Sequence, residues 1–259
     1  MFRGIDVSAA QGAISWPSLA PLGLQFAIAK AAEGNKGNDP IFDVPGFYVD
    51  HARSAGTSGQ DPRFAENVAG ARAAGLVVGC YSFAYPLPHQ DGNPIRDPEA
   101  QAKFHFDLAG GLGSLDGELP PMLDLEWPPP EDWGKWGCTP PQLRDWALRY
   151  LDAATGLWGC LPMVYTYPDW WLRVGGAGEP AFAEYPCWPA SYPTPPARWP
   201  TAGEKPLILR PWSDWLGWQF CGGGMTLPNG VRADFDVLNL DEAGLAALCR
   251  SGIPGVPLP

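Results

Sequence analysis

The sequence has few basic residues: 17 Lys and Arg stand against 28 Asp and Glu in 259 residues, which gives a formal net charge of −11. A negatively charged chain repels a phosphate backbone, so we expect no nucleic-acid partner. The N-terminus shows no apolar signal region, and no apolar run long enough to span a membrane follows it. We therefore expect synthesis in the cytoplasm without a signal peptide, and no membrane insertion.

Metal-ligand patterns are missing as well. The chain has 3 His and 6 Cys, but no Cys-x-x-Cys pair and no spacing typical of a zinc site. Cys80 and Cys187 lie in apolar, strand-like runs, which indicates buried thiols. The even number of Cys also permits disulfides, and the sequence does not decide their pairing.

The chain does contain enough apolar sequence for a core. Hydrophobic residues make up 46% and charged residues 17%, which excludes a disordered chain. Aromatic residues are frequent, with 13 Trp, 8 Tyr and 11 Phe. Such rings pack in cores, and they also stack on the apolar faces of sugars. Core packing and carbohydrate binding both remain explanations of the aromatic content.

Strand-like runs alternate with helical segments along the chain. The strand candidates are 2–7, 26–31, 76–84, 121–126, 163–167, 187–190, 218–220 and 235–238. Helical patterns with end signals lie at 61–74, from Asp97 to Gly110, after Thr139 and from Asp241 to Arg250. Each helical pattern falls between or after strand candidates, which is the arrangement of βαβ units.

Strands that alternate with helices form parallel sheets. The sequence therefore predicts an α/β fold, a TIM-like β/α barrel that is regular in the first half and irregular with few helices in the last third. We expect a single catalytic barrel over residues 1–252 and a loose C-terminal tail over residues 253–259.

Acidic residues gather at the expected strand ends. Asp124 and Glu126 follow an apolar run and, two residues apart on a strand, project from the same side. Close carboxylates raise each other's pKa, and a neutral carboxylic acid beside an ionised one is what hydrolysis of a glycosidic bond requires. Asp6, Glu33 and Asp234 lie at the ends of other strands, where barrels carry their active sites. Each acid alone also fits a cap, a turn or a salt bridge, so only their repetition favours a site.

Short motifs cover almost the whole chain in a fixed order. They are GIDVS at 4–8, FAIAKAAEG at 26–34, DPRF at 61–64, GCYSFA at 79–84, EAQA at 99–102, PMLDLEW at 121–127, CWPASY at 187–192, WQF at 218–220 and DFD at 234–236. In this order they resemble the glycoside hydrolase family 25 lysozymes, the Chalaropsis-type muramidases. Ser82 stands where that family usually has a His in the cleft, and Ala32 where a small hydroxyl residue is usual. Residues 35–58 look like an insertion, and 85–96 form a second long loop on the same rim.

The resemblance implies cleavage of the β-1,4 bond between N-acetylmuramic acid and N-acetylglucosamine in peptidoglycan. Glu126 is then the general acid, whose pKa neighbouring carboxylates and burial raise. Asp124 is expected to be ionised, either to stabilise the transition state or to orient the substrate's N-acetyl group. Asp6 and Asp234 are further cleft acids, with Asp236 as the alternative to Asp234. Retaining, inverting and substrate-assisted chemistry all remain open.

The resemblance also implies how the substrate is bound. The expected substrate-binding residues are Glu33, Tyr81, Trp127, Tyr165, Trp188 and Trp218. For each aromatic residue, core packing is the alternative. Carboxylate catalysis needs no metal or organic cofactor, so we expect none. The expected partner is the glycan strand of peptidoglycan, bound by a monomer.

Rival hypotheses stay open beside this one. A chitinase-like barrel needs another acid two residues before Asp124, where Met122 stands. A non-catalytic glycan-binding or virion structural protein that retains the barrel would not need an acid cluster. The expected setting is a phage lysin, made in the cytoplasm and acting on the bacterial cell wall during host lysis or from the virion.

Overall fold

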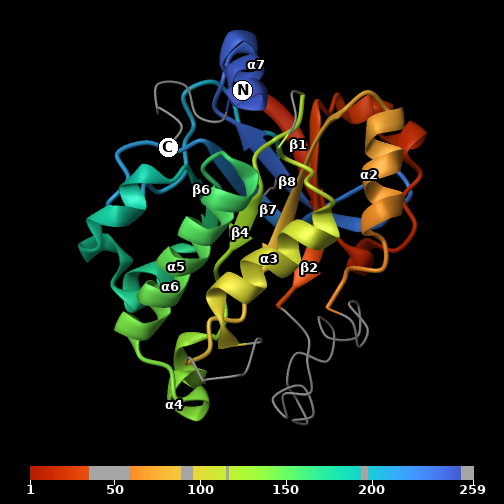
Figure 1. Cartoon of the computed structure of the whole chain (residues 1–259). Helices are drawn as coiled ribbons and strands as arrows, with labels where there is room; N and C mark the ends of the chain where they lie inside the picture. Colours follow the sequence, from red (N-terminus) through yellow and green to blue (C-terminus); the bar gives the residue numbers. More distant parts are fainter. Residues whose placement is uncertain (35–58, 89–95, 115–116, 194–197, 252–259) are drawn as a thin grey trace.

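The computed structural model describes residues 1–34, 59–88, 96–114, 117–193 and 198–251. Within them the chain folds into one sheet of eight strands with helices around it (Figure 1). The strands are β1 Phe2–Val7, β2 Phe26–Glu33, β3 Val77–Phe83, β4 Met122–Asp124, β5 Met163–Thr166, β6 Cys187–Pro189, β7 Gly217–Thr226 and β8 Arg232–Leu238. Every predicted strand is present, although β4 is shorter than expected and leaves Glu126 beyond its end.

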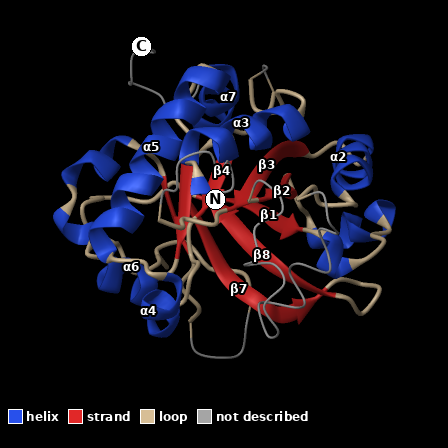
Figure 2. Cartoon of the chain, turned by 60° about the horizontal axis from the view of Figure 1, so that its bottom comes forward, coloured by secondary structure: helices blue, strands red, loops and turns tan. Residues whose placement is uncertain are grey.

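The sheet closes on itself almost completely. Its strand order is β6-β5-β4-β3-β2-β1-β8-β7, and β1 to β6 run parallel to one another. A parallel bridge between Ala190, just after β6, and Gln219 of β7 brings the two edges together. The sheet is therefore a nearly closed barrel with helices outside it (Figure 2), which confirms the predicted fold class.

Strand β8 departs from the parallel sheet that the sequence predicts. It pairs antiparallel with both β1 and β7. Only residues 227–231 separate β7 from β8, and a parallel crossover needs about a dozen residues or more. The short connection therefore makes β7 and β8 a hairpin.

The four helices that the end signals predict are present, together with two short helices that the sequence analysis did not identify. They are α2 Phe64–Ala73, α3 Pro98–Ala109, α4 Trp133–Trp136, α5 Pro140–Trp158, α6 Pro168–Val174 and α7 Glu242–Ser251. Short 3-10 segments cover Ala9–Gln11, Trp16–Leu22, Pro130–Asp132, Gly176–Gly178 and Pro180–Glu184. Asp97 caps α3 by accepting from the N–H groups of Glu99 and Ala100, as predicted. Between β6 and β7 no described residue is helical, in agreement with the predicted irregular last third.

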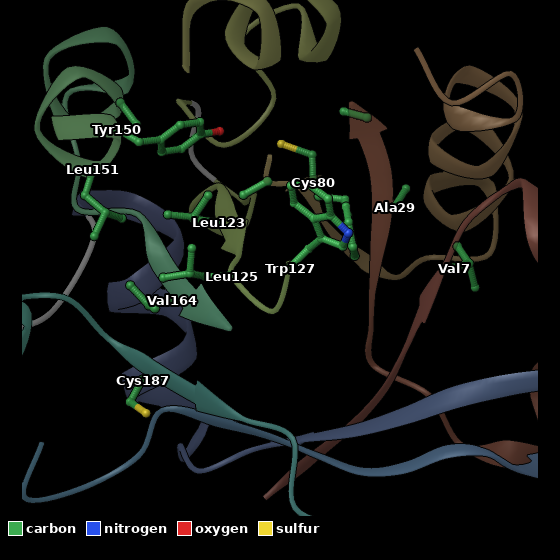
Figure 3. Close-up of a cluster of buried hydrophobic side chains, with 14 of the residues drawn as sticks. Val7, Ala29, Cys80, Leu123, Leu125, Trp127, Tyr150, Leu151, Val164 and Cys187 are labelled. Carbon is green, nitrogen blue, oxygen red and sulfur yellow. The ribbon is translucent and has the colours of Figure 1, made fainter. Parts of the chain in front are cut away.

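Alternate residues of the strands face opposite sides of the barrel wall. Outward-facing side chains, among them Val7, Ala29 and Leu123, belong to one large hydrophobic cluster with Tyr150 and Leu151 of α5 (Figure 3). We call this the outer cluster. It holds the helices against the barrel.

Inward-facing side chains form a second hydrophobic cluster, the inner cluster. It joins Phe26 and Leu238 to Leu248 of α7. Phe26 begins β2 and Leu238 ends the antiparallel β8, so α7 closes the barrel at the end where the parallel strands begin. The opposite end of the barrel is the one left for a site.

All six cysteines are buried free thiols. Cys80 and Cys187 belong to the outer cluster (Figure 3), which confirms the prediction of buried thiols at these two positions. Burial raises the pKa of both thiols, so both are held in the neutral form.

Several sequence predictions fall outside the described residues. The insertion at 35–58 and the tail at 253–259 lie there, so the bounds of the catalytic barrel stay a prediction. The loop at 85–96 is described in part, and its residues Tyr85 and Leu87 are buried in the outer cluster. In the described ranges we find no helix with both the length and the apolar character of a membrane span.

Candidate active site

The strand register brings the predicted acids to the open end of the barrel. Asp6 of β1 lies opposite Asp234 of β8, and Asp124 ends β4 beside Phe83 of β3. Because β8 runs against β1, Asp234 reaches this rim from near the start of its strand and not from its C-terminal end. The acids do meet on one rim, as predicted. The prediction that each of them lies at the C-terminal end of its strand is wrong for Asp234, because β8 runs in the opposite direction.

These side chains line one open pocket. The four acids predicted as catalytic all contribute to it: Asp6, Asp124, Glu126 and Asp234. The predicted sugar platforms Tyr81, Tyr165 and Trp188 line it too. Its other lining residues are Ser8, Ala10, Gln11, Lys30, Phe83, Met122, Gln219 and Asp236. Counted together, five carboxyl groups share this pocket.

Glu126 is a carboxylic acid that titrates near neutral pH. Its side chain follows β4 and is half-buried in the pocket. Burial, and then the negative charge of Asp234, raises its pKa to about 7, against an opposing effect of the Lys30 cation. A group with this pKa exists in both protonation states at neutral pH, so it can give a proton to a leaving oxygen.

Asp124 is more deeply buried than Glu126, with 7% of its surface exposed. Burial, and then the charge of Glu126, raises its pKa well above the ordinary range, while Lys30 acts in the other direction. Its Oδ1 has no hydrogen-bond partner among the described residues. Asp124 and Glu126 therefore titrate as a pair, and the free pocket does not by itself fix the expected split into an ionised Asp124 and a neutral Glu126.

The three acids of β1 and β8 also have raised pKa values. Burial, and then Asp6, raises the pKa of Asp234 to about 7. Burial raises the pKa of Asp236 to about 7 as well, although the Trp188 Nε1–H donates to its Oδ1 at 2.9 Å. Burial and Asp236 raise the pKa of Asp6 well above the usual value. Several carboxyl groups of the pocket are therefore partly neutral near pH 7.

Lys30 is a site residue that the sequence prediction did not include. Lys30 is 2% exposed, and its side chain lines the pocket and lowers the pKa of both Asp124 and Glu126. Among the described lining residues it is the one cation. The signal was present in the sequence, because a Lys inside the apolar run 26–33 can be buried only with a charged partner.

Glu33 is that partner, and it does not line the pocket where substrate binding was predicted. Its Oε2 accepts from Lys30 Nζ at 2.6 Å and its Oε1 accepts from the Tyr85 hydroxyl at 2.6 Å. The register of β2 on β3 shifts between Lys30 and Ala32, so simple alternation does not hold here, and the Glu33 carboxylate meets the Lys30 ammonium group although the residues are three apart. The structure shows it as half of a buried ion pair that holds the Lys30 ammonium group.

Trp127 and Trp218, predicted as sugar platforms, also lie outside the pocket. Trp127 is 2% exposed and packs edge-on against Tyr85, with 4.9 Å between the ring centroids. Trp218 is 3% exposed and donates its Nε1–H to the Ser191 carbonyl at 2.6 Å. Both rings belong to the outer cluster, so the core-packing alternative describes their observed positions.

Ser82, which stands where the resembled family usually has a His in the cleft, faces outward too. It pairs in register with the outward-facing Leu123 and is fully buried. Its place between two inward-facing positions of β3, Tyr81 and Phe83, explains why it does not reach the pocket.

Gln219 and Tyr192 are further residues that the prediction missed. Gln219 is 5% exposed, and its Oε1 accepts from the hydroxyls of Tyr165 at 3.0 Å and Tyr192 at 2.6 Å. Its Nε2 donates to Asp6 Oδ2 at 2.8 Å. A polar side chain between Trp218 and an aromatic neighbour in a buried strand is the signal that could have identified Gln219.

The arrangement suits acid catalysis on a sugar. A carboxyl group with a pKa of about 7 faces further carboxyl groups and aromatic rings in one pocket. Among the described residues no group of His, Cys, Asp and Glu is arranged to hold a metal ion.

Comparisons with known proteins agree with this chemistry. Lysozyme M1 of Streptomyces globisporus is 29% identical over 259 residues, which cover 96% of this chain and 71% of that protein. The N,O-diacetylmuramidase of Chalaropsis sp. is 29% identical over 178 residues, covering 67% of this chain and 70% of that protein. The crystal structure of the bacterial lysozyme from Streptomyces coelicolor has a TM-score of 0.72 at 26% identity and covers 96% of both chains. The family model of glycosyl hydrolases family 25 matches residues 48–227, more than half of the chain, so this protein belongs to that family and is a glycoside hydrolase.

Proposed function

We propose that the protein cleaves the β-1,4 bond between N-acetylmuramic acid and N-acetylglucosamine in peptidoglycan, with Glu126 as general acid. The relatives named lysozyme and muramidase support peptidoglycan as the substrate. The observation that carries the catalytic role is the raised pKa of Glu126, about 7, in a pocket that four other carboxyl groups line. A neutral Glu126 gives its proton to the leaving glycosidic oxygen.

Asp124 is proposed to act on the substrate directly. Its Oδ1 is an acceptor without a partner among the described residues, and the side chain lines the pocket. The N–H of a substrate acetamido group would satisfy it. Burial and Glu126 disfavour the ionised carboxylate that this contact needs, whereas Lys30 favours it. A hydrogen bond from the substrate would add to the effect of Lys30.

Tyr81, Tyr165 and Trp188 are the proposed sugar contacts, since their rings line the pocket. Asp6 and Asp234 are proposed to set the charge around Glu126. The proposed contacts do not include the side chains of Glu33, Trp127 and Trp218, which are buried away from the pocket.

The setting follows from the proposed substrate. The bacterial cell wall is the place of action, and a phage lysin acting as a monomer is the proposed context. Expression in a bacterial cytoplasm is then expected to lyse cells only after the membrane is permeabilised. Lysis at the same rate with an intact membrane would contradict this context.

The experiment that tests the function is digestion of purified peptidoglycan, followed by reduction of the products and mass spectrometry. Fragments that end in reduced N-acetylmuramic acid support the proposal. Fragments that end in reduced N-acetylglucosamine keep a glycosidase but contradict the proposed bond. No release of fragments by a folded protein that binds the wall would favour a non-catalytic glycan-binding protein.

A further inference from the structure

Asp6 and Asp236 are two carboxyl groups that line the pocket beside Glu126. They lie on neighbouring strands: Asp6 is opposite Asp234, and Asp236 is opposite Gly4. Residues two apart share a face, so both carboxyl groups project into the barrel. Diagonal neighbours across antiparallel strands are within reach of each other, and Gly4 has no side chain to separate them.

Each carboxyl group of the pair has one neutral N–H donor of its own. Gln219 Nε2 donates to Asp6 Oδ2 at 2.8 Å, and Trp188 Nε1 donates to Asp236 Oδ1 at 2.9 Å. Asp236 Oδ2 is buried and has no hydrogen-bond partner in the described part of the chain, and each carboxyl group shifts the pKa of the other. Two carboxylates have only acceptors, so a hydrogen bond between them requires a proton on one of them.

The orientation of the Gln219 side-chain amide follows from the hydrogen bonds that its oxygen accepts. Its Oε1 accepts from the hydroxyl groups of Tyr165 and Tyr192, which come from β5 and from the segment after β6. The NH2 group is left to face Asp6. A reversed amide would put its oxygen against the oxygens of Asp6, where it would repel an ionised carboxylate.

Gln219 is also held by its backbone. It forms the bridge to Ala190 that closes the barrel, and its carbonyl accepts from the Ser191 N–H at 3.1 Å. The amide is therefore anchored on one side by the closure of the barrel and on the other by two hydroxyl groups. A side chain held at both ends is suited to position a neighbour.

We propose that Asp6 and Asp236 share one proton as a carboxyl–carboxylate pair, and that Gln219 is the positioning residue that holds Asp6 in it. The surroundings favour a pair that gives up its two protons in separate steps. Burial and the neighbouring acid raise the pKa of Asp6 far above its usual value, whereas burial raises that of Asp236 to about 7. Between the two steps the pair carries one negative charge.

Other groups act on this pair from every side of the pocket. Those that face Asp6 are Lys30 of β2, Tyr81 of β3, Asp124 and Glu126 at the end of β4, Tyr165 of β5, Tyr192 after β6 and Asp234 of β8. Lys30 is the one cation among them, and it is paired with Glu33. The surroundings are thus mostly acidic, which favours retention of the proton.

The effect on catalysis rests on the proposed function, although the shared proton does not. An ionised Asp6 raises the pKa of Asp234, and the charge of Asp234 raises that of Glu126. If the pair keeps its proton, it carries less negative charge, and the pKa of Glu126 is raised less.

The test is an NMR titration of the protein with ¹³C-labelled Asp side chains. The expected result is that one carboxyl group of the pair is still protonated above neutral pH. In Asp236→Asn the pKa of Asp6 is expected to fall by about 1 or more, because the competing acid is gone. Asp145→Asn, an exposed acid of α5, is the matched control and leaves Asp6 unchanged. Independent titration of both groups in the ordinary carboxyl range would overturn the shared proton.

The role of Gln219 is tested by Gln219→Met, which keeps the shape and removes the donor. The pKa of Asp6 is expected to rise, because Asp6 loses a hydrogen bond that favours its charged form, while Asp236 keeps its donor Trp188. A merely loosened pocket would admit water and lower the pKa values of both acids. Tyr165→Phe with Tyr192→Phe keeps Gln219 but frees its amide, and is expected to shift Asp6 in the same direction. If neither variant raises the pKa of Asp6, Gln219 does not position it.

Digestion of peptidoglycan by the same wild-type sample separates the two claims. A coupled titration without hydrolysis would count against the proposed function alone. Hydrolysis with two independent, ordinary titrations would count against the shared proton alone.

Discussion

The two faces of the barrel wall are made by alternate residues of the same strands, and they do different things. On β4, Leu123 joins the outer cluster while Asp124 lines the pocket; on β5, Val164 and Tyr165 divide in the same way. The outer face holds the helices, and the inner face at the open end carries the acids. Neighbours in sequence therefore differ more in role than residues on distant strands do.

The tryptophans make the same comparison within one residue type. Trp188 faces inward and donates to Asp236, whereas Trp218 faces outward and donates to a backbone carbonyl. Both are almost fully buried. The side of the strand, and not the kind of residue, decides which ring can meet a substrate.

The substitution with the largest expected effect is Glu126→Gln on the inner face, which tests the catalytic role of that face. We expect the rate of peptidoglycan hydrolysis to fall by about 10²–10⁴-fold, the usual contribution of a general acid, with an unchanged unfolding midpoint. Glu131→Gln, at an exposed acid outside the pocket, is the control and should keep the wild-type rate. A folded Glu126→Gln variant that hydrolyses at the wild-type rate would remove Glu126 as the acid.

The matching substitution on the outer face is Leu123→Ala, which tests the role of that face in stability. Leu123 is fully buried, so the lost contacts and the remaining cavity are expected to reduce the free energy of unfolding by about 2–5 kcal/mol. The hydrolysis rate of the folded protein should stay within about twofold, since the side chain does not line the pocket. Urea unfolding measures the first effect. Leu172→Ala, at a side chain 61% exposed on α6, should change stability by less than about 0.5 kcal/mol.

Trp188→Phe and Trp218→Phe form a matched pair with a smaller effect. Each removes one indole N–H bond, so each is expected to cost about 1 kcal/mol or more in urea unfolding. Only Trp188→Phe should raise the pKa of Asp236, because that N–H favours the ionised carboxylate. Equal changes in the pH–rate profiles of the two variants would contradict the division into faces.

The raised pKa values of the inner face also predict how stability depends on pH. Glu126, Asp234 and Asp236 each have a folded-state pKa of about 7, above the values of 4.5, 3.8 and 3.8 that such groups have when exposed. The folded protein therefore binds more protons than the unfolded chain between these values, and stability falls as the pH rises from about 4 through 7. Thermal unfolding should occur at a higher temperature near pH 5 than near pH 8, and Asp234→Asn should reduce the difference. A midpoint that rises over this range would contradict the raised pKa values.

Most of the fold could be predicted from apolar runs and helix end signals. The direction of β8 could not, since β7 continues through Gly222, Gly223 and Gly224. Glycines carry no side chain, so the alternating pattern that marks a strand disappears there. The sequence therefore showed two short strands far apart, 218–220 and 235–238, and gave no sign of a hairpin between them.

The sequence predicted which strand ends carry the acids. It predicted less well which side of the barrel wall each neighbouring residue faces. Asp124 and Glu126 were placed by local sequence. Trp127 lies an odd number of residues from Asp124, so alternation alone could have assigned it to the outer cluster. For Trp218 and Gln219, the register of β7 on β8 shows which of the two faces inward.

The most direct test of the account is the pH dependence of kcat/KM for the wild-type enzyme on soluble peptidoglycan fragments. Glu126 on the inner face must be protonated to act, so the account predicts a rate that falls at alkaline pH with an apparent pKa near 7. A rate that stays constant from about pH 5 to 9 would mean that no group of this pocket supplies the proton.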